Sequence, residues 1–144
     1  MTPRSTTQRI ADTRDRLEHD IDAWVSTVDS DGEPRLAPLS FLWHDGRLLI
    51  ATSRTGATGR NLLERPTARL GIGELRDLVL IDGSVETAEP DTVTADAFAD
   101  KAGYDPRPIE GFVFFWVMPR SIEAWREEDE LAGRYILRDG AWLA

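Results

Sequence analysis

Asp-Gly pairs set between β-branched and aromatic runs constrain the fold of this chain more than any other feature. Asp31-Gly32 lies between AWVSTVD and PRLAPLSFLWH, and Asp45-Gly46 separates that second run from RLLIATS. Asp-Gly favours a tight hairpin turn because both residues tolerate a positive φ. The segments 23–29, 34–44 and 47–53 are therefore predicted to be three antiparallel strands joined by short turns.

More strands are expected along the rest of the chain. TARLGIGE and LVLIDGSVETAE follow, and in the second of them Val79, Ile81 and Val85 recur with the two-residue period of a half-buried sheet. GFVFFWVMP and SIEAWRE are both strand-like, and RYILRDGAWLA predicts a last hairpin around Asp139-Gly140. About seven or eight antiparallel strands result, and such a set tends to close into a barrel because closure removes exposed edges.

Two or three short helices are expected among these strands. Ile10, Leu17 and Ile21 fall on one stripe of an amphipathic first helix within residues 1–21. Residues 60–65 predict a short helix that Pro66 ends, because proline cannot continue the hydrogen-bond ladder. PDTVTADAFADKAGY predicts another, with Val93, Ala97 and Ala102 at near-helical spacing. The chain is thus interpreted as one mainly β domain over 1–144, with an N-terminal helix (1–21) and a barrel (22–143).

Composition excludes several classes of function. The net charge is -9, and the basic residues are spread among acidic ones, so we expect no nucleic-acid partner. The absence of cysteine excludes disulfides, thiol catalysis and iron–sulfur clusters, and it suits a reducing cytoplasm. His19 and His44 are far apart, so no metal site is predicted. No signal peptide or membrane span of about 20 apolar residues is visible, and we expect a soluble, cytoplasmic protein.

The stretch ATSRTGATGRNL, from Ala51 to Leu62, holds the most promising polar groups. A predicted strand ends there in hydroxyl residues, a bend with two glycines follows, and a short helix begins near Arg60 and Asn61. A helix N-terminus offers unpaired N–H groups, and the guanidiniums of Arg54 and Arg60 add bidentate donors, which is what a phosphate monoester needs. The alternative is a polar bend in which Thr58 simply caps the helix.

The order AWVSTVDSDGEPRLAPLSFLWHDGRLLIATS, then the bend, then RNLLERPTARLGI, resembles the flavin-binding split-barrel family related to pyridoxamine 5'-phosphate oxidase, which also includes deazaflavin-dependent reductases. The tail PRSIEAWREEDELAGRYILRDGAWL resembles the family's closing strand, helical turn and hairpin. The similarity runs from about Asp22 to Leu143. It implies an FMN-binding split β-barrel that forms a homodimer, with the flavin at the subunit interface and a small-molecule substrate.

The resemblance also implies positions for the cofactor. Pro38, Leu39 and Ser40 would lie along the ring system, and Thr52 and Ser53 near the ribityl phosphate. Trp125 matches a tryptophan that approaches the flavin, and Arg134 lies one position from a flavin-contacting arginine. No catalytic residue and no metal ligand is predicted. The predicted cofactor-binding residues are Pro38, Leu39, Ser40, Thr52, Ser53, Arg54, Thr58, Arg60, Asn61, Trp125 and Arg134.

Two departures from the family pattern bear on function. Ala57 and Thr58 stand where the oxidase has an adjacent Arg-Lys pair that grips the phosphate. Glu-Leu-Ala-Gly-Arg, ending at Arg134, replaces an Arg-Leu-His-x-Arg stretch for the phosphorylated substrate, so oxidation of pyridoxamine phosphate is not expected. The main hypothesis is an FMN-dependent oxidoreductase; the alternatives are a reductase that uses the deazaflavin F420 and a non-catalytic protein that binds flavin or haem.

Overall fold

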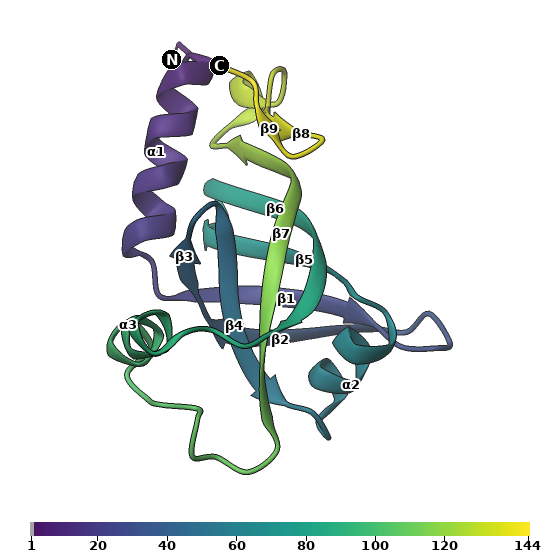
Figure 1. Ribbon diagram of the computed structural model, residues 1–144. Coiled ribbons are helices and arrows are strands. Elements are labelled where there is room, and N and C mark those ends of the chain that lie inside the picture. The colour runs from purple at the N-terminus through teal and green to yellow at the C-terminus, as the bar shows by residue number, and fades with distance from the viewer. Residues whose placement is uncertain (1) are drawn as a thin grey trace.

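The computed structural model describes residues 2–144, so Met1, the first residue of the predicted 1–21 segment, lies outside it. The chain forms an antiparallel set of strands and three α-helices, with most strands following one another directly (Figure 1). The strands are β1 (Asp22–Val28), β2 (Pro34–Ser40), β3 (Leu42–His44), β4 (Arg47–Ser53), β5 (Thr67–Glu74), β6 (Asp77–Ala88), β7 (Phe112–Trp125), β8 (Tyr135–Arg138) and β9 (Ala141–Trp142). The helices are α1 (Thr6–His19), α2 (Ala57–Glu64) and α3 (Thr92–Ala102).

The strands form one antiparallel sheet in the order β2-β1-β5-β6-β7-β4-β3, with β8 on β7 and β9 on β8. The sheet curls until β2, at one end of this order, lies against β4 near the other end. No ladder joins β2 to β4 among residues 2–144, so the barrel is split along this line. The predicted mainly β fold, a split β-barrel with small helices, is confirmed.

The Asp-Gly pairs do form turns, but of two kinds. Asp45 and Gly46 have φ values of 50° and 75°, and Asp139 and Gly140 have 52° and 76°, as a tight two-residue hairpin requires. Between β1 and β2 only Gly32 has a positive φ, because the turn is longer and the Asp29 N–H donates to the Glu33 carbonyl at 3.1 Å. All three predicted hairpins are confirmed.

Two predicted strand boundaries are wrong. The run 34–44 is broken at Phe41, which is fully buried and donates its N–H to the Ile21 carbonyl at 2.9 Å instead of joining a ladder. GFVFFWVMP and SIEAWRE merge into the single strand β7, which pairs with β6 on both sides of Pro119. Asp82 pairs with Ser121 and Gly83 with Pro119, so Arg120 of β7 is the extra residue of a bulge. The sheet has nine strands where seven or eight were predicted.

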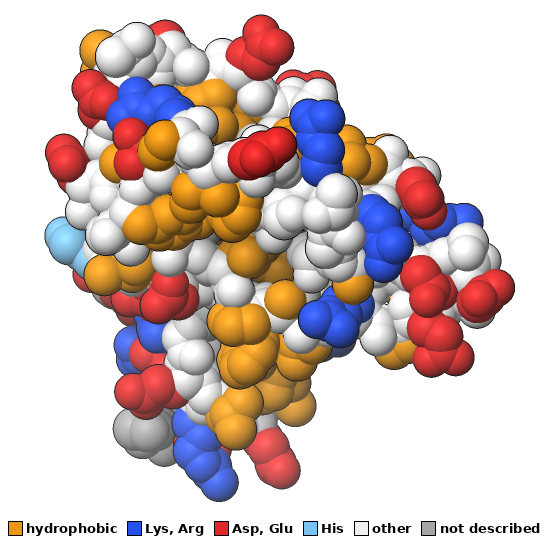
Figure 2. Space-filling model, turned by 90° about the horizontal axis from the view of Figure 1, so that it is seen from below, with side chains coloured by type: hydrophobic (Ala, Val, Ile, Leu, Met, Phe, Trp, Pro, Cys, Tyr) orange, Lys and Arg blue, Asp and Glu red, His pale blue; other side chains and the backbone are white. Residues whose placement is uncertain are grey.

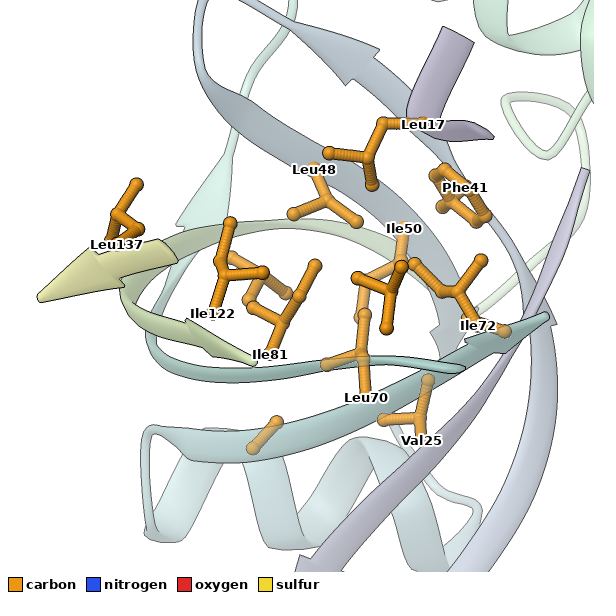
Figure 3. Close-up of a cluster of buried hydrophobic side chains, with 14 of the residues drawn as sticks. Leu17, Val25, Phe41, Leu48, Ile50, Leu70, Ile72, Ile81, Ile122 and Leu137 are labelled. Atoms are coloured by element: carbon orange, nitrogen blue, oxygen red, sulfur yellow. The ribbon is translucent and has the colours of Figure 1, made fainter. Parts of the chain in front are cut away.

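The core fills the barrel interior, where Leu48, Ile50, Leu70, Ile81 and Ile122 point toward one another from different strands (Figure 3). The first helix contributes Ile10 and Leu17 to this core, as predicted. Ile21 does not belong to that stripe: α1 ends at His19, and Ile21 is 46% exposed.

A smaller core lies on the outer face of β4 and β7, beneath α3. It is formed by Leu49, Ala51, Phe98 and Trp116. The predicted helix α3 is confirmed, but its predicted stripe is wrong: Val93 is 79% exposed, and α3 buries Thr94, Ala95 and Phe98 instead.

Buried charged groups fasten α1 to the segment after β7. The Glu130 carboxylate is 4% exposed and accepts hydrogen bonds from the Arg4 guanidinium at 2.7 and 2.9 Å. The Arg9 guanidinium, also 4% exposed, donates to the carbonyl oxygens of Ala124 and Glu130 at 3.1 and 2.8 Å. Hydrogen bonds from Arg4 lower the pKa of Glu130 to about 2 although burial opposes this. The N-terminal helix is therefore attached to the closing part of the chain by ionic groups as well as by packing.

We expect Glu130→Gln to lower the free energy of unfolding by about 3 kcal/mol at pH 7, because it leaves buried guanidinium groups without a counter-charge. Since the folded-state pKa lies below the ordinary value of 4.5, Glu130 stabilises the fold above that value and loses this contribution as the pH falls toward 2. Urea unfolding should show the difference between wild type and variant shrinking over this range.

Arg76→Gln is the matched control, because it removes the exposed ion pair between Arg76 and Glu127 in the same region. It should cost less than about 1 kcal/mol at any pH. A wild-type-to-Glu130→Gln difference that stayed constant down to pH 3 would contradict the assigned role of Glu130.

Candidate functional site

The split leaves two strand edges without backbone partners. β2 pairs with β1 along its whole length on one side, and its other edge has no strand partner within residues 2–144. β4 pairs with β7 over Leu48–Ser53, but β3 covers only Arg47–Leu49 of its opposite edge. The edges of Pro34–Ser40 and Ile50–Ser53 therefore offer free N–H and C=O groups, which can bind the polar rim of a ligand.

The predicted polar bend lies at the end of the β4 edge. The Ser53 hydroxyl is 3.1 Å from the Thr55 hydroxyl and accepts from the Thr55 N–H at 3.3 Å. Helix α2 then begins at Ala57, three residues earlier than predicted, with Gly56 as its N-cap. The alternative reading, in which Thr58 caps the helix, is wrong. Because Gly56 has no side chain, the first N–H groups of α2 lack a side-chain acceptor, and this positive helix end can receive an anion.

Close packing fixes the angle at which α2 leaves β4. A Cβ atom at Gly59 would overlap the Ser53 carbonyl oxygen and come within 3.2 Å of the Arg54 Cα. Gly59 itself is buried in the helix. The Arg54 N–H donates to the Gly111 carbonyl at 2.9 Å, so the bend is also tied to the loop before β7. These contacts hold the backbone of the bend in one conformation.

Arg54 and Arg60 both line a cavity of about 600 Å³ beside this helix end. The chain has seventeen basic residues, and within residues 2–144 all but Arg35, Arg54 and Arg60 contact a carboxylate or an aromatic ring. Two guanidiniums that form no ion pair within residues 2–144 therefore face one cavity, whose lining also includes Glu89, in a protein of net charge -9. This arrangement attracts an anionic group.

The other predicted site residues near the split differ in their surroundings, and two of them already donate hydrogen bonds within the chain. Ser40 donates its hydroxyl to the Asp22 carboxylate at 2.7 Å, Leu39 packs against the barrel core, and Pro38 is exposed. Asn61 is buried and donates its amide to the Thr27 hydroxyl at 3.1 Å. Thr58 is buried as well, while Thr52 and Ser53 are half-buried at the end of β4. The Asn61 side chain thus faces β1 instead of the cavity.

Trp125 and Arg134 lie at the other end of the molecule. Along β7, Phe112 pairs with Ser53 and Trp125 pairs with Leu78. Measured along its path, a strand of 14 residues is about 40 Å long. The Arg134 guanidinium donates to the Glu123 carboxylate at 2.8 Å, and the Trp125 Nε1 is buried without an acceptor within residues 2–144. One chain therefore gathers the predicted residues of β2, β4 and the bend, but not Trp125 or Arg134.

No sequence pattern predicted the far wall of the cavity. Thr87, Ala88 and Glu89 come from the end of β6, Val113 from the start of β7, and Leu63 from the second turn of α2. Only the curl of the sheet brings these segments to the bend, and no local motif marks them. Seen from below, apolar side chains gather in patches between separate basic groups (Figure 2).

Within residues 2–144, no group of three or more histidine, aspartate or glutamate side chains is arranged to hold a metal ion. In that same stretch no helix has the length and apolar character needed to cross a bilayer.

Comparison with known proteins gives a family match. The family model described as pyridoxamine 5'-phosphate oxidase matches residues 11–126, from within α1 to just past β7. No curated protein matches the chain.

The solved structures with a similar fold include proteins named for different cofactors. An F420 reductase is 19% identical, with a TM-score of 0.65, over 76% of this chain and 94% of its own. A heme binding protein from Mycobacterium smegmatis is 17% identical, with a TM-score of 0.73, over 97% of this chain and 60% of its own. A FAD-binding protein from Mesorhizobium loti is 18% identical, with a TM-score of 0.63, over 78% and 89%. These similarities establish the fold alone.

Gly59→Ala tests whether the bend is held as tightly as its contacts indicate. We expect it to lower the free energy of unfolding by about 2 kcal/mol, because the new methyl group displaces α2 from the Ser53 carbonyl. Gly56→Ala is the control, since its Cβ would meet Ser53 at an ordinary 3.7 Å, and it should cost less than about 1 kcal/mol. Equal costs in urea unfolding would show that the packing at Gly59 is not constraining.

Proposed function

This chain belongs to the pyridoxamine 5'-phosphate oxidase family, and from that membership we propose that it is an FMN-dependent oxidoreductase acting on a small molecule. The observation that carries the proposal is the pair Arg54 and Arg60, two cations that form no ion pair within residues 2–144, beside an uncapped helix N-terminus at the split. We also infer a cytoplasmic location, which the absence of cysteine suits.

The phosphate of FMN fits the bend. Arg54 and Arg60 would pair with its charge, the first N–H groups of α2 would donate to its oxygens, and the hydroxyls of Ser53 and Thr55 stand at the same place. These two arginines replace the Arg-Lys pair of the oxidase, whose positions here hold Ala57 and Thr58.

The ring system of FMN fits the split beside the bend. The free edge of β2 would supply backbone donors and acceptors to the polar rim of the ring, and Pro38 and Leu39 would supply apolar contact. Bound flavin supplies hydride or electron transfer, and the chain's own residues hold the ring and exclude water from it. The substrate differs from pyridoxamine phosphate, because Glu-Leu-Ala-Gly-Arg replaces the stretch that would bind it.

The proposed site is shared between two copies of the chain in a homodimer. Trp125 and Arg134 lie about 40 Å along β7 from the bend, so they cannot reach a flavin bound at the bend of their own chain. A second copy related by a twofold axis would bring its Trp125 to this site. The outer sheet face suits such contact, since Trp24 is 53% and Leu36 61% exposed beside a hollow of about 280 Å³.

F420 and haem are the competing ligands. F420 also carries a phosphate and would use the same cations, so the fold does not separate it from FMN. Haem needs an axial ligand such as histidine. His19 pairs with Asp15 on α1, and His44 stacks on Trp116 on the outer face of the sheet, which favours a flavin. Titration with each ligand decides: binding of F420 alone would make the protein a deazaflavin reductase, and binding without turnover would make it a carrier or sensor.

Arg54→Ala and Arg60→Ala should each raise the dissociation constant for FMN about tenfold, because each removes a charge-assisted contact to the phosphate. The constant is measured by flavin absorbance and by quenching of tryptophan emission. Arg65→Ala is the control, since Arg65 lies beyond the opposite end of α2 and pairs with Glu64. Unchanged affinity in both bend variants would remove the bend from the site.

Complementation between variants tests whether the site is shared. One chain carries Arg54→Ala with Arg60→Ala, and the other carries Trp125→Leu with Arg134→Ala; the two are co-expressed with different tags. The purified heterodimer should hold one tight FMN site per two chains, while each parent dimer holds none. A monomer in sedimentation, or a heterodimer without a restored site, would contradict the shared site.

A further inference from the structure

The loop 126–133 connects Trp125, the last residue of β7, to Arg134, just before β8. Because it has no strand partner, its carbonyl groups need hydrogen-bond donors from elsewhere. The Arg9 guanidinium supplies them: it donates to the carbonyl oxygens of Glu130 and Gly133 at 2.8 and 3.2 Å, and to that of Ala124 at 3.1 Å. The Arg9 side chain of α1 therefore holds the backbone just before Trp125 and the backbone of the loop that follows it.

The Glu130 carboxylate forms a second attachment. Besides the Arg4 guanidinium, it accepts the Arg4 backbone N–H at 2.9 Å and the Arg126 backbone N–H at 2.9 Å. Arg126 directly follows Trp125, so the carboxylate joins the N-terminal arm to the residue beside the indole. Other charged groups that face the cluster are Arg9, 4.0 Å from Glu130, Asp12, 3.1 Å from Arg4, and the Arg126 guanidinium, 3.8 Å from Asp12.

Within residues 2–144, no hydrogen bond to the Trp125 indole fixes its orientation. Its Nε1 is buried without an acceptor within residues 2–144, so the ring is held by packing and by its backbone alone. The Arg134 carbonyl accepts the Ala124 N–H at 2.8 Å, and the Arg134 guanidinium donates to the Leu131 carbonyl in the loop at 3.0 Å. A shift of the loop would therefore move Trp125 and Arg134 together.

We infer that Arg4 and Arg9 are positioning residues for Trp125 and Arg134. Through the loop 126–133, the N-terminal helix of one protomer sets the orientation of the two side chains that this protomer contributes to a flavin on its partner. The inference rests on the proposed function for the role of Trp125 and Arg134 as cofactor contacts; the attachment itself rests on the geometry above.

A double-mutant cycle separates positioning from plain stabilisation. FMN affinity is measured for wild type, Arg4→Gln, Trp125→Phe and the double variant, at a temperature where all are folded. We expect Arg4→Gln to raise the FMN dissociation constant about tenfold in the wild-type background and less than about twofold in the Trp125→Phe background. A role in stability alone predicts the same small effect in both backgrounds.

Arg14→Gln, on the helix α1 that follows Arg4, is the control. Arg14 contacts the Trp142 ring, 4.6 Å from its centroid, and makes no contact with the loop 126–133 among the interactions of residues 2–144. It should leave FMN affinity unchanged while removing a cationic contact from α1. Should Arg4→Gln fail to fold, Arg4→Lys keeps the charge but loses the two-pronged contact with Glu130, and it should show the same pattern at smaller size.

A measurement without cofactor keeps the inference distinct from the proposed function. Protein labelled with 5-fluorotryptophan gives one fluorine resonance per tryptophan, and Trp125→Phe identifies the one from residue 125. In Arg4→Gln this resonance should shift or broaden, and in Arg14→Gln it should not. If wild type binds no FMN, the proposed function fails, but the fluorine resonance still shows whether Arg4 positions Trp125. An unmoved resonance, or additive FMN effects, would overturn the inference.

Discussion

The split in the barrel depends on one buried residue, Phe41. At Phe41 the chain leaves the edge of β1 and joins the edge of β4, and its N–H bonds to the Ile21 carbonyl instead of to a strand. A continuous strand from 34 to 44 would have paired with one neighbour only and left the sheet either open or fully closed. The break turns the sheet so that β2 contacts β4 without a ladder, and the two free edges of the candidate site result.

Local sequence signals predicted the turns and most strands, because those depend on residues close in the chain. Asp45-Gly46 and Asp139-Gly140 adopt the positive φ values that make such pairs turn formers. The break at Phe41 could not be predicted in this way, since PRLAPLSFLWH has a strand-like composition throughout and the burial of Phe41 depends on tertiary packing. The same limit explains Val93: spacing predicted a helix, but the sheet beneath decides which face is buried.

The candidate site divides in the same way. Arg54 and Arg60 stood out because a glycine-containing bend between a strand and a helix has a local signature. The opposite wall, with Thr87, Glu89 and Val113, has none, because two distant strands meet there only after the sheet has curled. The separation of the bend from Trp125 could not be predicted either, since it depends on GFVFFWVMP and SIEAWRE forming one strand. Resemblance placed both in one site, whereas in the chain they lie at opposite ends of β7.

The positions of the two cations follow from how α2 packs. Thr58 is 6% exposed, so a lysine at that position would have its charge forced against the barrel, where desolvation disfavours it. Around this helix end, residues 54, 55 and 60 face the cavity. With α2 fixed by Gly59 against Ser53, one cation faces the cavity from the residues before the helix, Arg54, and one from the end of its first turn, Arg60. Under the proposed function, these two positions would carry the positive charge that the Arg-Lys pair carries in the oxidase.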